Sequence, residues 1–513
     1  MSNARRTAKL AAMIGIFTLM SKFLGFLREV FIASKYGSGY ETDTYFVAMT
    51  ATTIIMTTIG ASLNTTLIPI FTEIEEKWGR RGKLRYLNNI LNIITFITII
   101  LALLAFVLSP VIIRILAKGF EGEQFELAVK LNRIGLPIII FLGFTYVFSG
   151  YLHSSEIFGP HAIMGLPYNF VFLFYLIFLA DGSNIEGLML TSVVAASTQF
   201  LIQVPAIRHQ GYRYRLDINL KDPYLKRALI LVIPVMLGTA VQQVNTIIDR
   251  TLASSLVEGS ISALTYASRL KDLIISVFVT AITTVVFPML AKSFSQQDGR
   301  QVKRILEQGI NLILLITVPA TVGIIILAEP IVRVFFQRGA FDSTATAMTS
   351  QAFIFYSLGL VGASLRLMLN RVFYAFQDTK TPMLNGVLVV GLNVVLNLIL
   401  IRFMAHSGLA LATSISATFT TLLLFLSLRK KIGPIGLRGY LKSFLKTLIS
   451  SLVMGLVVYF LYFGLTAKFV DSRIGELMVL LLSVILGALV YFILCAILRV
   501  KEIKILVKGL IKK

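Results

Sequence analysis

Long apolar runs alternate with short charged segments along almost the whole chain. Each run is long enough for an α-helix to cross about 30 Å of hydrocarbon. The pattern therefore predicts an all-α polytopic membrane protein with fourteen transmembrane helices. The runs cover residues 8–34, 44–71, 87–109, 128–151, 160–180, 187–207, 228–256, 262–290, 306–328, 346–370, 381–401, 403–428, 447–467 and 477–498.

Basic residues gather at the N-terminus and in every second connection between these runs. The connections rich in Lys and Arg are 77–85, 208–227, 292–304, 429–446 and 499–513. The alternate connections, such as 181–186 and 257–261, are short and almost free of Lys and Arg. Because basic loops stay in the cytoplasm, we predict that both termini are cytoplasmic. The first run is charged and has no small-residue cleavage site, so we expect it to be retained.

Composition and charge exclude several classes of protein. Of the 513 residues, 56% are hydrophobic and only 14% are charged, which excludes disorder and argues against a soluble multidomain enzyme. The net charge of +23 lies largely in the basic connections, so membrane topology explains it and no nucleic-acid partner is expected. The single cysteine, Cys495, rules out an intramolecular disulfide. We find no P-loop, no HExxH motif and no metal-ligand spacing among the four histidines, so no enzymatic activity is predicted.

An internal repeat divides the chain. LIPIFTE at 67–73 matches VFPMLAK at 286–292, and SPVIIRILAKGF at 109–120 matches EPIVRVFFQRGAF at 329–341, both at a spacing of about 220 residues. An even number of helices per repeat preserves orientation, so the repeat predicts two parallel six-helix lobes. We place the N-terminal lobe at 1–215 and the C-terminal lobe at 216–430. Residues 431–513 then hold two additional transmembrane helices and a basic tail.

Charged residues inside the predicted spans are the first candidate site. They fall mainly in the first two helices of each repeat: Lys22, Arg28, Glu29, Asp43, Asp249, Arg250, Arg269, Lys271 and Asp272. Each costs at least about 2.5–3.5 kcal/mol at the bilayer centre, so such groups usually face a cavity or a partner. Cations exceed anions in this set, which favours an anionic substrate such as a phosphate or pyrophosphate. Alternatively, the charges are interfacial or form intramolecular ion pairs.

Polar residues in the eleventh and twelfth spans suggest a second site. Asn393 and Asn397 are four residues apart and share one helix face, and Thr413 lies one helix later. With Asp249 they offer the oxygen ligands that a small cation such as sodium prefers. Two alternatives remain open: hydrogen bonds between helices, or a proton site at Asp249.

Four motifs resemble a known family. They are MSKFLGFLREVFIASKYGSGYETDTYFVA at 20–48, IGASLNTTLIPIF at 59–71, YASRLKDLIISVFVTAITTVVFPMLAK at 266–292 and RVFYAFQDTKTP at 371–382. They resemble the MurJ (MviN) lipid II flippases of the multidrug/oligosaccharidyl-lipid/polysaccharide exporter superfamily, over about the first 430 residues. The resemblance implies two six-helix lobes around an alternating-access cavity for the lipid II headgroup, and a groove near the last two helices for the lipid tail.

The resemblance also implies particular site residues. The family's substrate-binding positions fall on Lys22, Arg28, Asp43 and Arg269. Its sodium ligands fall on Asp249, Asn393, Asn397 and Thr413, with a backbone carbonyl near Leu409. Lys22 stands where the family has an arginine, Asn397 replaces an acidic ligand of some relatives, and a second-helix arginine has no counterpart near Met56.

Together these observations predict a monomeric flippase of the bacterial inner membrane. It carries lipid II, an undecaprenyl-pyrophosphate-linked muropeptide, from the inner to the outer leaflet. Its partners are lipid II and the surrounding membrane lipids, and no cofactor is expected except a possible sodium ion. Three alternatives remain open. The chain could move another polyprenyl-pyrophosphate oligosaccharide, export drugs by cation coupling within the same superfamily, or be a membrane scaffold whose charges merely pair.

Overall fold

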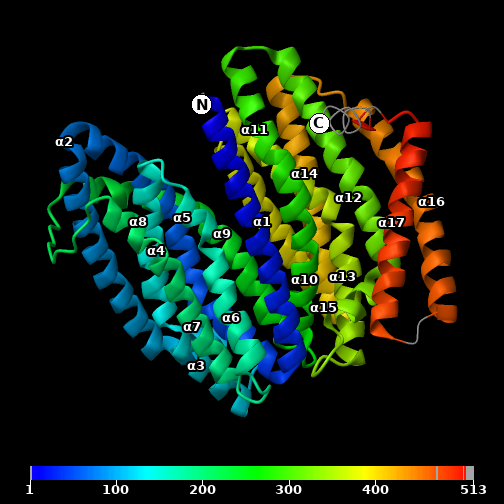
Figure 1. The fold of residues 1–513 in the computed structure, drawn as a ribbon, viewed down its shortest axis with the longest axis horizontal. Helices are drawn as coiled ribbons and strands as arrows, with labels where there is room; N and C mark the ends of the chain where they lie inside the picture. Colours follow the sequence, from blue (N-terminus) through cyan, green and yellow to red (C-terminus); the bar gives the residue numbers. More distant parts are fainter. Residues whose placement is uncertain (1–2, 470–471, 501, 504–513) are drawn as a thin grey trace. The chain divides into compact units, whose positions relative to one another are not determined.

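The computed structural model describes residues 3–469, 472–500 and 502–503, and these residues form an all-helical protein (Figure 1). Each of the fourteen predicted runs lies almost entirely on one helix or on consecutive helices of this part of the chain, which confirms the predicted spans. Within it, nine helices are long and apolar enough to cross a membrane, or ten if the bent pair α13–α14 is one span. The basic tail at 504–513 and residues 1–2 lie outside the described residues.

The chain packs as two compact units. Unit 1 comprises Met1–Ser262 with Arg338–Phe341, and unit 2 comprises Ala263–Gln337 with Asp342–Lys513. The packed units divide after Ser262, whereas the two predicted repeats divide after residue 215. The division into lobes at 1–215, 216–430 and 431–513 therefore stays a prediction from the sequence repeat.

Unit 1 contains a helix that serves as two spans. Its helices are α1 (Asn3–Tyr36), α2 (Tyr40–Leu116), α3 (Gly122–Gly135), α4 (Pro137–Ser154), α5 (Gly159–Ile163), α6 (Gly165–Phe178), α7 (Ile185–Leu201), α8 (Val204–His209) and α9 (Pro223–Ala253). Inside α2, Gly79 has φ 64° and ψ −175°, a conformation that only glycine adopts without strain. This break separates the two apolar runs of α2.

Unit 2 contains a second broken helix. Its helices are α10 (Ser260–Ile274, whose first three residues belong to unit 1), the π-helix η1 (Ile275–Val279), α11 (Thr280–Ser295), α12 (Gly299–Phe336), α13 (Ser343–Leu358), α14 (Leu360–Ala375), α15 (Lys380–Ile432), α16 (Leu437–Phe469) and α17 (Arg473–Ile497). Ala405 breaks α15 with φ 47° and ψ −131°. Between α13 and α14, a Cβ on Gly359 would lie 2.5 Å from Ser414 Cα, so glycine permits close contact with α15 at the 48° bend.

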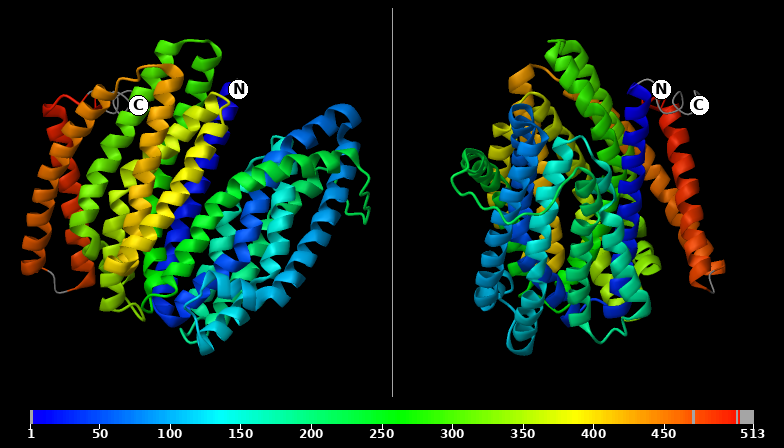
Figure 2. Two further views of the ribbon diagram at one scale, coloured as in Figure 1. Left: turned by 180° about the vertical axis from the view of Figure 1, so that it is seen from behind. Right: turned by 60° about the vertical axis from the view of Figure 1, so that its left-hand side comes forward.

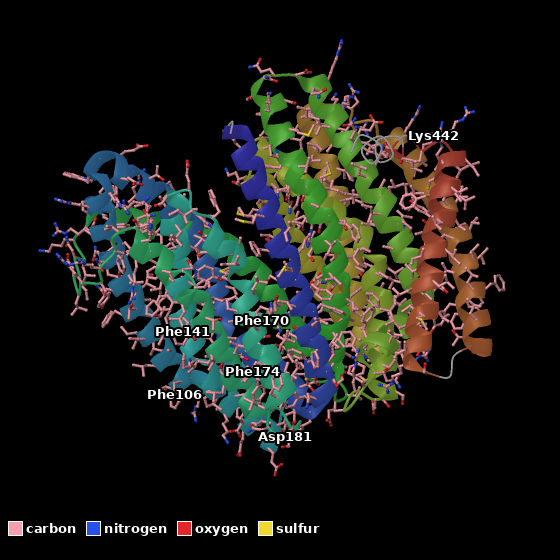
Figure 3. All side chains as sticks on the ribbon, viewed as in Figure 1. Phe106, Phe141, Phe170, Phe174, Asp181 and Lys442 are labelled. Carbon is pink, nitrogen blue, oxygen red and sulfur yellow. The ribbon has the colours of Figure 1, made fainter. Side chains whose placement is uncertain are left out.

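Apolar side chains cover the outside of unit 1. Phe106, Phe170 and Phe174, which Figure 3 labels, are 49%, 55% and 59% exposed. On the second half of α2, Phe96 and Leu103 are each 63% exposed. Apolar surfaces of this extent are rare on soluble proteins and fit hydrocarbon contact.

The two C-terminal helices pack against α12 within unit 2 through a buried hydrophobic cluster. Helices α16 and α17 lie side by side in both views of Figure 2. Tyr491 of α17 donates a hydrogen bond of 2.9 Å to the carbonyl of Leu315 in α12. Cys495 is fully buried in the same cluster, so the only thiol of the chain is a packing residue.

An ion pair closes the helical hairpin formed by α15. Asp378 precedes the helix and accepts hydrogen bonds from the Thr381 N–H at 3.0 Å and the Thr381 hydroxyl at 2.9 Å. Lys431, at the far end of α15, donates to the same carboxylate at 2.6 Å. The two ends of α15 can meet because the helix reverses at Ala405. The Lys431 ammonium and the Thr381 N–H lower the pKa of Asp378 to about 2.

We predict that Asp378→Asn lowers the free energy of unfolding by about 1 kcal/mol at pH 7, a modest value because water screens the half-exposed Lys431. The folded-state pKa of Asp378 lies below the unfolded value of about 3.9. The carboxylate therefore stabilises the protein above pH 4, and this stabilisation is lost as the pH falls toward 2. Thermal unfolding of the purified protein between pH 7 and pH 2 measures the effect.

Lys430→Gln is the matched control, because it removes the neighbouring cation and leaves the ion pair intact. A double-mutant cycle of Asp378→Asn with Lys431→Gln should show coupling, whereas Lys430→Gln should be additive. Equal losses from Lys430→Gln and Lys431→Gln would contradict the assigned pair.

Candidate functional site

Arg28 is the most enclosed cation among the predicted substrate-binding residues. Its guanidinium donates to Glu29 Oε1 at 2.7 Å and to Asn169 Oδ1 at 3.2 Å. The same group lies over the rings of Tyr168 and Phe172, with its central carbon 5.4 and 5.0 Å from the ring centroids. In the described part of the chain, these hydrogen bonds engage two of the five N–H groups of a guanidinium. The side chain is 17% exposed.

The sequence places Arg28 by simple local rules. It lies on the continuous helix α1, seven residues after Ser21, whose carbonyl accepts a hydrogen bond from Asn169 Nδ2 at 3.1 Å. Asn169 lies in the second of two consecutive segments, GPHAI and GLPYNF, where Gly and Pro end one helix and start the next. The amide of Asn169 thus connects α6 to α1 and orients the arginine.

A cavity of about 330 Å³ adjoins this cluster within unit 1. It is lined by hydroxyl and amide groups among apolar side chains: Met49, Thr53, Thr57, Ile138, Leu142, Thr145, Tyr146, Met164, Tyr168, Ser192, Ala196 and Gln199. Tyr168 borders both the cavity and Arg28. The cavity therefore offers neutral hydrogen-bonding groups beside one arginine, which suits a polar anionic ligand better than a cation.

Asp43 occupies a different environment from the one that the sequence suggested. Its carboxylate accepts from the Gly259 N–H at 2.9 Å, the Ser262 N–H at 2.7 Å and the Ser262 hydroxyl at 2.6 Å. The side chain is buried at the N-terminus of α10, where backbone N–H groups favour an anion. These bonds give Asp43 a role in joining the α1–α2 turn to the α9–α10 turn. A role in substrate binding stays a prediction.

Lys22 does not belong to the Arg28 cluster. It is exposed on α1, about 9 Å along the helix axis from Arg28 and on another face of the helix. Arg269 belongs to unit 2, where it is an exposed residue of α10, roughly one and a half turns before the π-helix η1. Single π-helical turns are frequent at functional sites.

Four of the five expected sodium ligands belong to the two halves of α15. Asn397 Nδ2 donates to Asn393 Oδ1 at 3.0 Å, and Asn393 Nδ2 donates to Ser416 Oγ at 3.3 Å across the break in the helix. The Thr413 hydroxyl donates to the Leu409 carbonyl at 3.0 Å. The fifth, Asp249, accepts from Asn245 at 3.2 Å in unit 1. Amide, hydroxyl and carbonyl oxygens accept more than one interaction each, so the donor set of α15 fits a small hard cation.

Reasoning from the sequence missed Asn169 and Tyr168, which contact Arg28. A signal for Asn169 was present, because it is the one amide in the apolar run 160–180 apart from the flanking turns. An amide in such a run needs a partner inside the protein. Tyr168 carried no signal, since aromatic residues recur throughout the apolar runs.

Comparisons with known proteins agree with this geometry. The family model for lipid II flippase MurJ matches residues 32–501. The chain is 28% identical over 425 residues to the lipid II flippase MurJ of Burkholderia cenocepacia, covering 81% of this chain and 82% of the relative. It is 30% identical over 419 residues to the probable lipid II flippase MurJ of Rickettsia prowazekii, covering 80% and 82%.

Solved structures give the same result. A lipid II flippase MurJ in an inward closed conformation aligns with a TM-score of 0.79 and 27% identity, covering 95% of this chain and 99% of the other. An inward-facing MATE multidrug transporter aligns with a TM-score of 0.68 at 14% identity, covering 83% and 98%, and thus shares the fold. The family model covers most of the chain, and the resemblance of the four motifs is confirmed. The chain belongs to the MurJ family of lipid II flippases, which are multi-pass membrane transporters and not enzymes.

Proposed function

We propose that this protein moves lipid II from the cytoplasmic to the outer leaflet of the bacterial inner membrane by alternating access, acting as a monomer. The observation that carries the proposal is Arg28, a buried guanidinium with open N–H donors beside a polar cavity, in a chain of the MurJ family. Charge-assisted hydrogen bonds from arginine suit the pyrophosphate that links the lipid to the sugar. An exporter of cationic drugs would favour an acidic cavity instead.

Glu29 and Asn169 give Arg28 a defined state before substrate arrives. The carboxylate of Glu29 neutralises the guanidinium within the membrane, and Asn169 fixes its plane. A phosphate can then use the remaining donors without a large rearrangement, which lowers the entropic cost of binding. With the cell interior negative, outward movement of an anionic headgroup is favoured by about 2.3 kcal/mol per charge per 100 mV.

We further propose that Asn393, Asn397, Thr413 and the Leu409 carbonyl hold a sodium ion together with Asp249. A bound cation would neutralise a carboxylate that is expensive in hydrocarbon. Support for the ion comes from the chemistry of the donor set on α15, where four oxygen donors lie within two consecutive spans. Helix-to-helix hydrogen bonding alone is the competing explanation.

If both termini are cytoplasmic, the eighth span, 262–290, begins outside the cytoplasm and ends inside it. Val257 is 66% exposed before α10, and Gln296 is exposed after α11. With the buried Cys495 replaced by serine, a membrane-impermeant thiol reagent added to intact cells should label Val257→Cys, and Gln296→Cys only after the cells are opened. The reverse labelling would overturn the topology.

Arg28→Ala should abolish growth when the gene is expressed in bacteria depleted of their own MurJ, with protein abundance near normal. Removing charge-assisted hydrogen bonds worth about 1.5–3 kcal/mol lowers substrate affinity roughly tenfold or more. Arg269→Ala should do the same if both arginines contact the pyrophosphate. Lys22→Arg, which restores the family residue, should be tolerated.

Arg114→Ala is the matched control for charge removal. Arg114 is an exposed arginine of α2 that lies over the ring of Phe125, away from the cavity residues. This variant should grow normally. Normal growth of a double variant lacking Arg28 and Arg269 would refute the assignment, whereas failure of the unaltered protein to restore growth would point to another polyprenyl-pyrophosphate substrate.

Sodium should raise the melting temperature of the purified protein more than potassium does. At tenfold excess over the dissociation constant, an ion that binds only the folded state stabilises it by about 1.4 kcal/mol. The sodium shift should disappear in Asp249→Asn and weaken in Thr413→Val. Ser416→Ala is the control, because it alters the hydrogen bond to Asn393 without removing an assigned ligand. Equal shifts with sodium and potassium would contradict the site.

A further inference from the structure

The connection between α8 and α9 is an ordered segment fixed to unit 1. We call residues 211–222 the strap. Figure 1 shows it as the thin green loop beside α2, and the rear view in Figure 2 shows the same arrangement. It begins where Arg80 Nε donates to the Gln210 carbonyl at 3.1 Å, and it ends where Asp222 caps α9 through the Tyr224 N–H at 2.9 Å. Both ends are therefore anchored.

Three asparagines of α2 hold the backbone of the strap. Asn88 exchanges hydrogen bonds with Arg213 and Arg215, at 3.1 and 3.0 Å. Asn89 exchanges hydrogen bonds of 3.1 and 2.8 Å with the carbonyl and N–H of Asn219. Asn92 donates to the carbonyls of Arg215 at 2.9 Å and Asp217 at 3.1 Å. All these bonds go to odd-numbered residues, so the odd-numbered backbone groups face α2.

Three large apolar side chains of the strap are exposed: Leu216, Ile218 and Leu220, at 80%, 51% and 72%. Tyr214 instead turns back to α2, where its hydroxyl donates a hydrogen bond of 2.8 Å to Asn92 Oδ1 and adds a further anchor. A row of three large apolar residues on a firmly held backbone is unfavourable in water, which indicates that another apolar phase covers it.

Basic residues surround this apolar row. The strap and its flanks contain Arg208, Arg213, Arg215, Lys221, Lys226 and Arg227, against Asp217 and Asp222. Asp217 is partly neutralised by Arg85, 3.5 Å away, and Asp222 is used in the helix cap. The surface around the apolar row is therefore complementary to anions.

The register of α2 places the strap at the edge of the hydrocarbon. Asn92 lies on the face of α2 that continues one turn later with Phe96 and then Leu103, both 63% exposed. One turn of helix spans about 5.4 Å. The strap thus covers the last polar turn before the apolar outer surface begins, at the depth of lipid headgroups.

We propose that the strap is a membrane-docking element. Its row of Leu216, Ile218 and Leu220 enters the headgroup region, and Arg213, Arg215 and Lys221 bind acidic phospholipid headgroups of the same leaflet. Interfacial segments of this kind combine apolar insertion with attraction to anionic lipids. The proposal is independent of the transported substrate.

Quenching of a single tryptophan by brominated lipids tests the docking. Trp78 is the only tryptophan of the chain, so Trp78→Phe combined with Leu216→Trp puts the sole fluorophore in the strap. The full-length protein is placed in nanodiscs of phosphatidylcholine and phosphatidylglycerol, with bromine on the acyl chains of one or the other lipid. We expect strong quenching, greater when the acidic lipid carries the bromine. In Arg213→Gln/Arg215→Gln this preference should fall about fivefold per cation removed.

Two matched variants calibrate the measurement in the same Trp78→Phe background. Phe96→Trp should be quenched equally by both lipids, because its side chain faces hydrocarbon, and Gln296→Trp in the polar α11–α12 connection should stay unquenched. Absence of quenching at position 216 would overturn the docking and leave a protein partner as the cover of the apolar row. Equal quenching by both lipids, unchanged in the arginine variant, would overturn the acidic-headgroup assignment.

Discussion

A polar group inside hydrocarbon must find its partner within the protein, because no water is present to replace a missing hydrogen bond. Arg28 meets this requirement with the carboxylate of Glu29, the amide of Asn169 and two aromatic faces. Three predicted spans lie between Arg28 and Asn169 in the sequence, so this requirement for a partner connects distant spans. The same partners that make the charge tolerable also fix its orientation, and orientation is what recognition of an anion needs.

The same need for a partner inside the protein applies to Lys83, which does not line the cavity. Lys83 is fully buried near the break in α2, where it binds the Glu75 carboxylate and donates to Ser155 Oγ at 2.7 Å. Its ammonium also lies 4.9 Å from the centroid of the Tyr151 ring. Glu75 is 42% exposed, so its removal would mainly leave the buried Lys83 ammonium without a counter-charge, which costs more than the pair contributes. We therefore regard Lys83 as a structural connection between α2 and α4 and not as a substrate ligand.

The sequence predicted the fourteen spans because the cost of burying charge acts on each segment separately. Hydropathy alone located both halves of α2 and of α15, although it gave no sign that each pair continues through a single broken helix.

Residues whose role depends on a partner distant in the sequence were less predictable. A carboxylate at the start of an apolar run, such as Asp43, suits a substrate-binding site or a helix N-terminus equally well, and only the structure shows the hydrogen bonds that it accepts from Gly259 and Ser262. The strap was visible only as a basic connection, because its exposed apolar row depends on which backbone groups Asn88, Asn89 and Asn92 hold.

Asn393 holds the two halves of α15 together and is also a ligand of the proposed sodium site. Its amide nitrogen joins the two halves of α15 through Ser416, while its carbonyl oxygen accepts from Asn397 and keeps a second lone pair. Hydrogen bonds between membrane helices are each worth only about 0.6 kcal/mol on average, so this network alone stabilises the hairpin weakly. The ion pair of Asp378 with Lys431 holds the two ends of α15 together at the open end of the same hairpin. The oxygens of Asn393 and Asn397 therefore need not provide all of the stability of the hairpin, which leaves them available for the proposed cation.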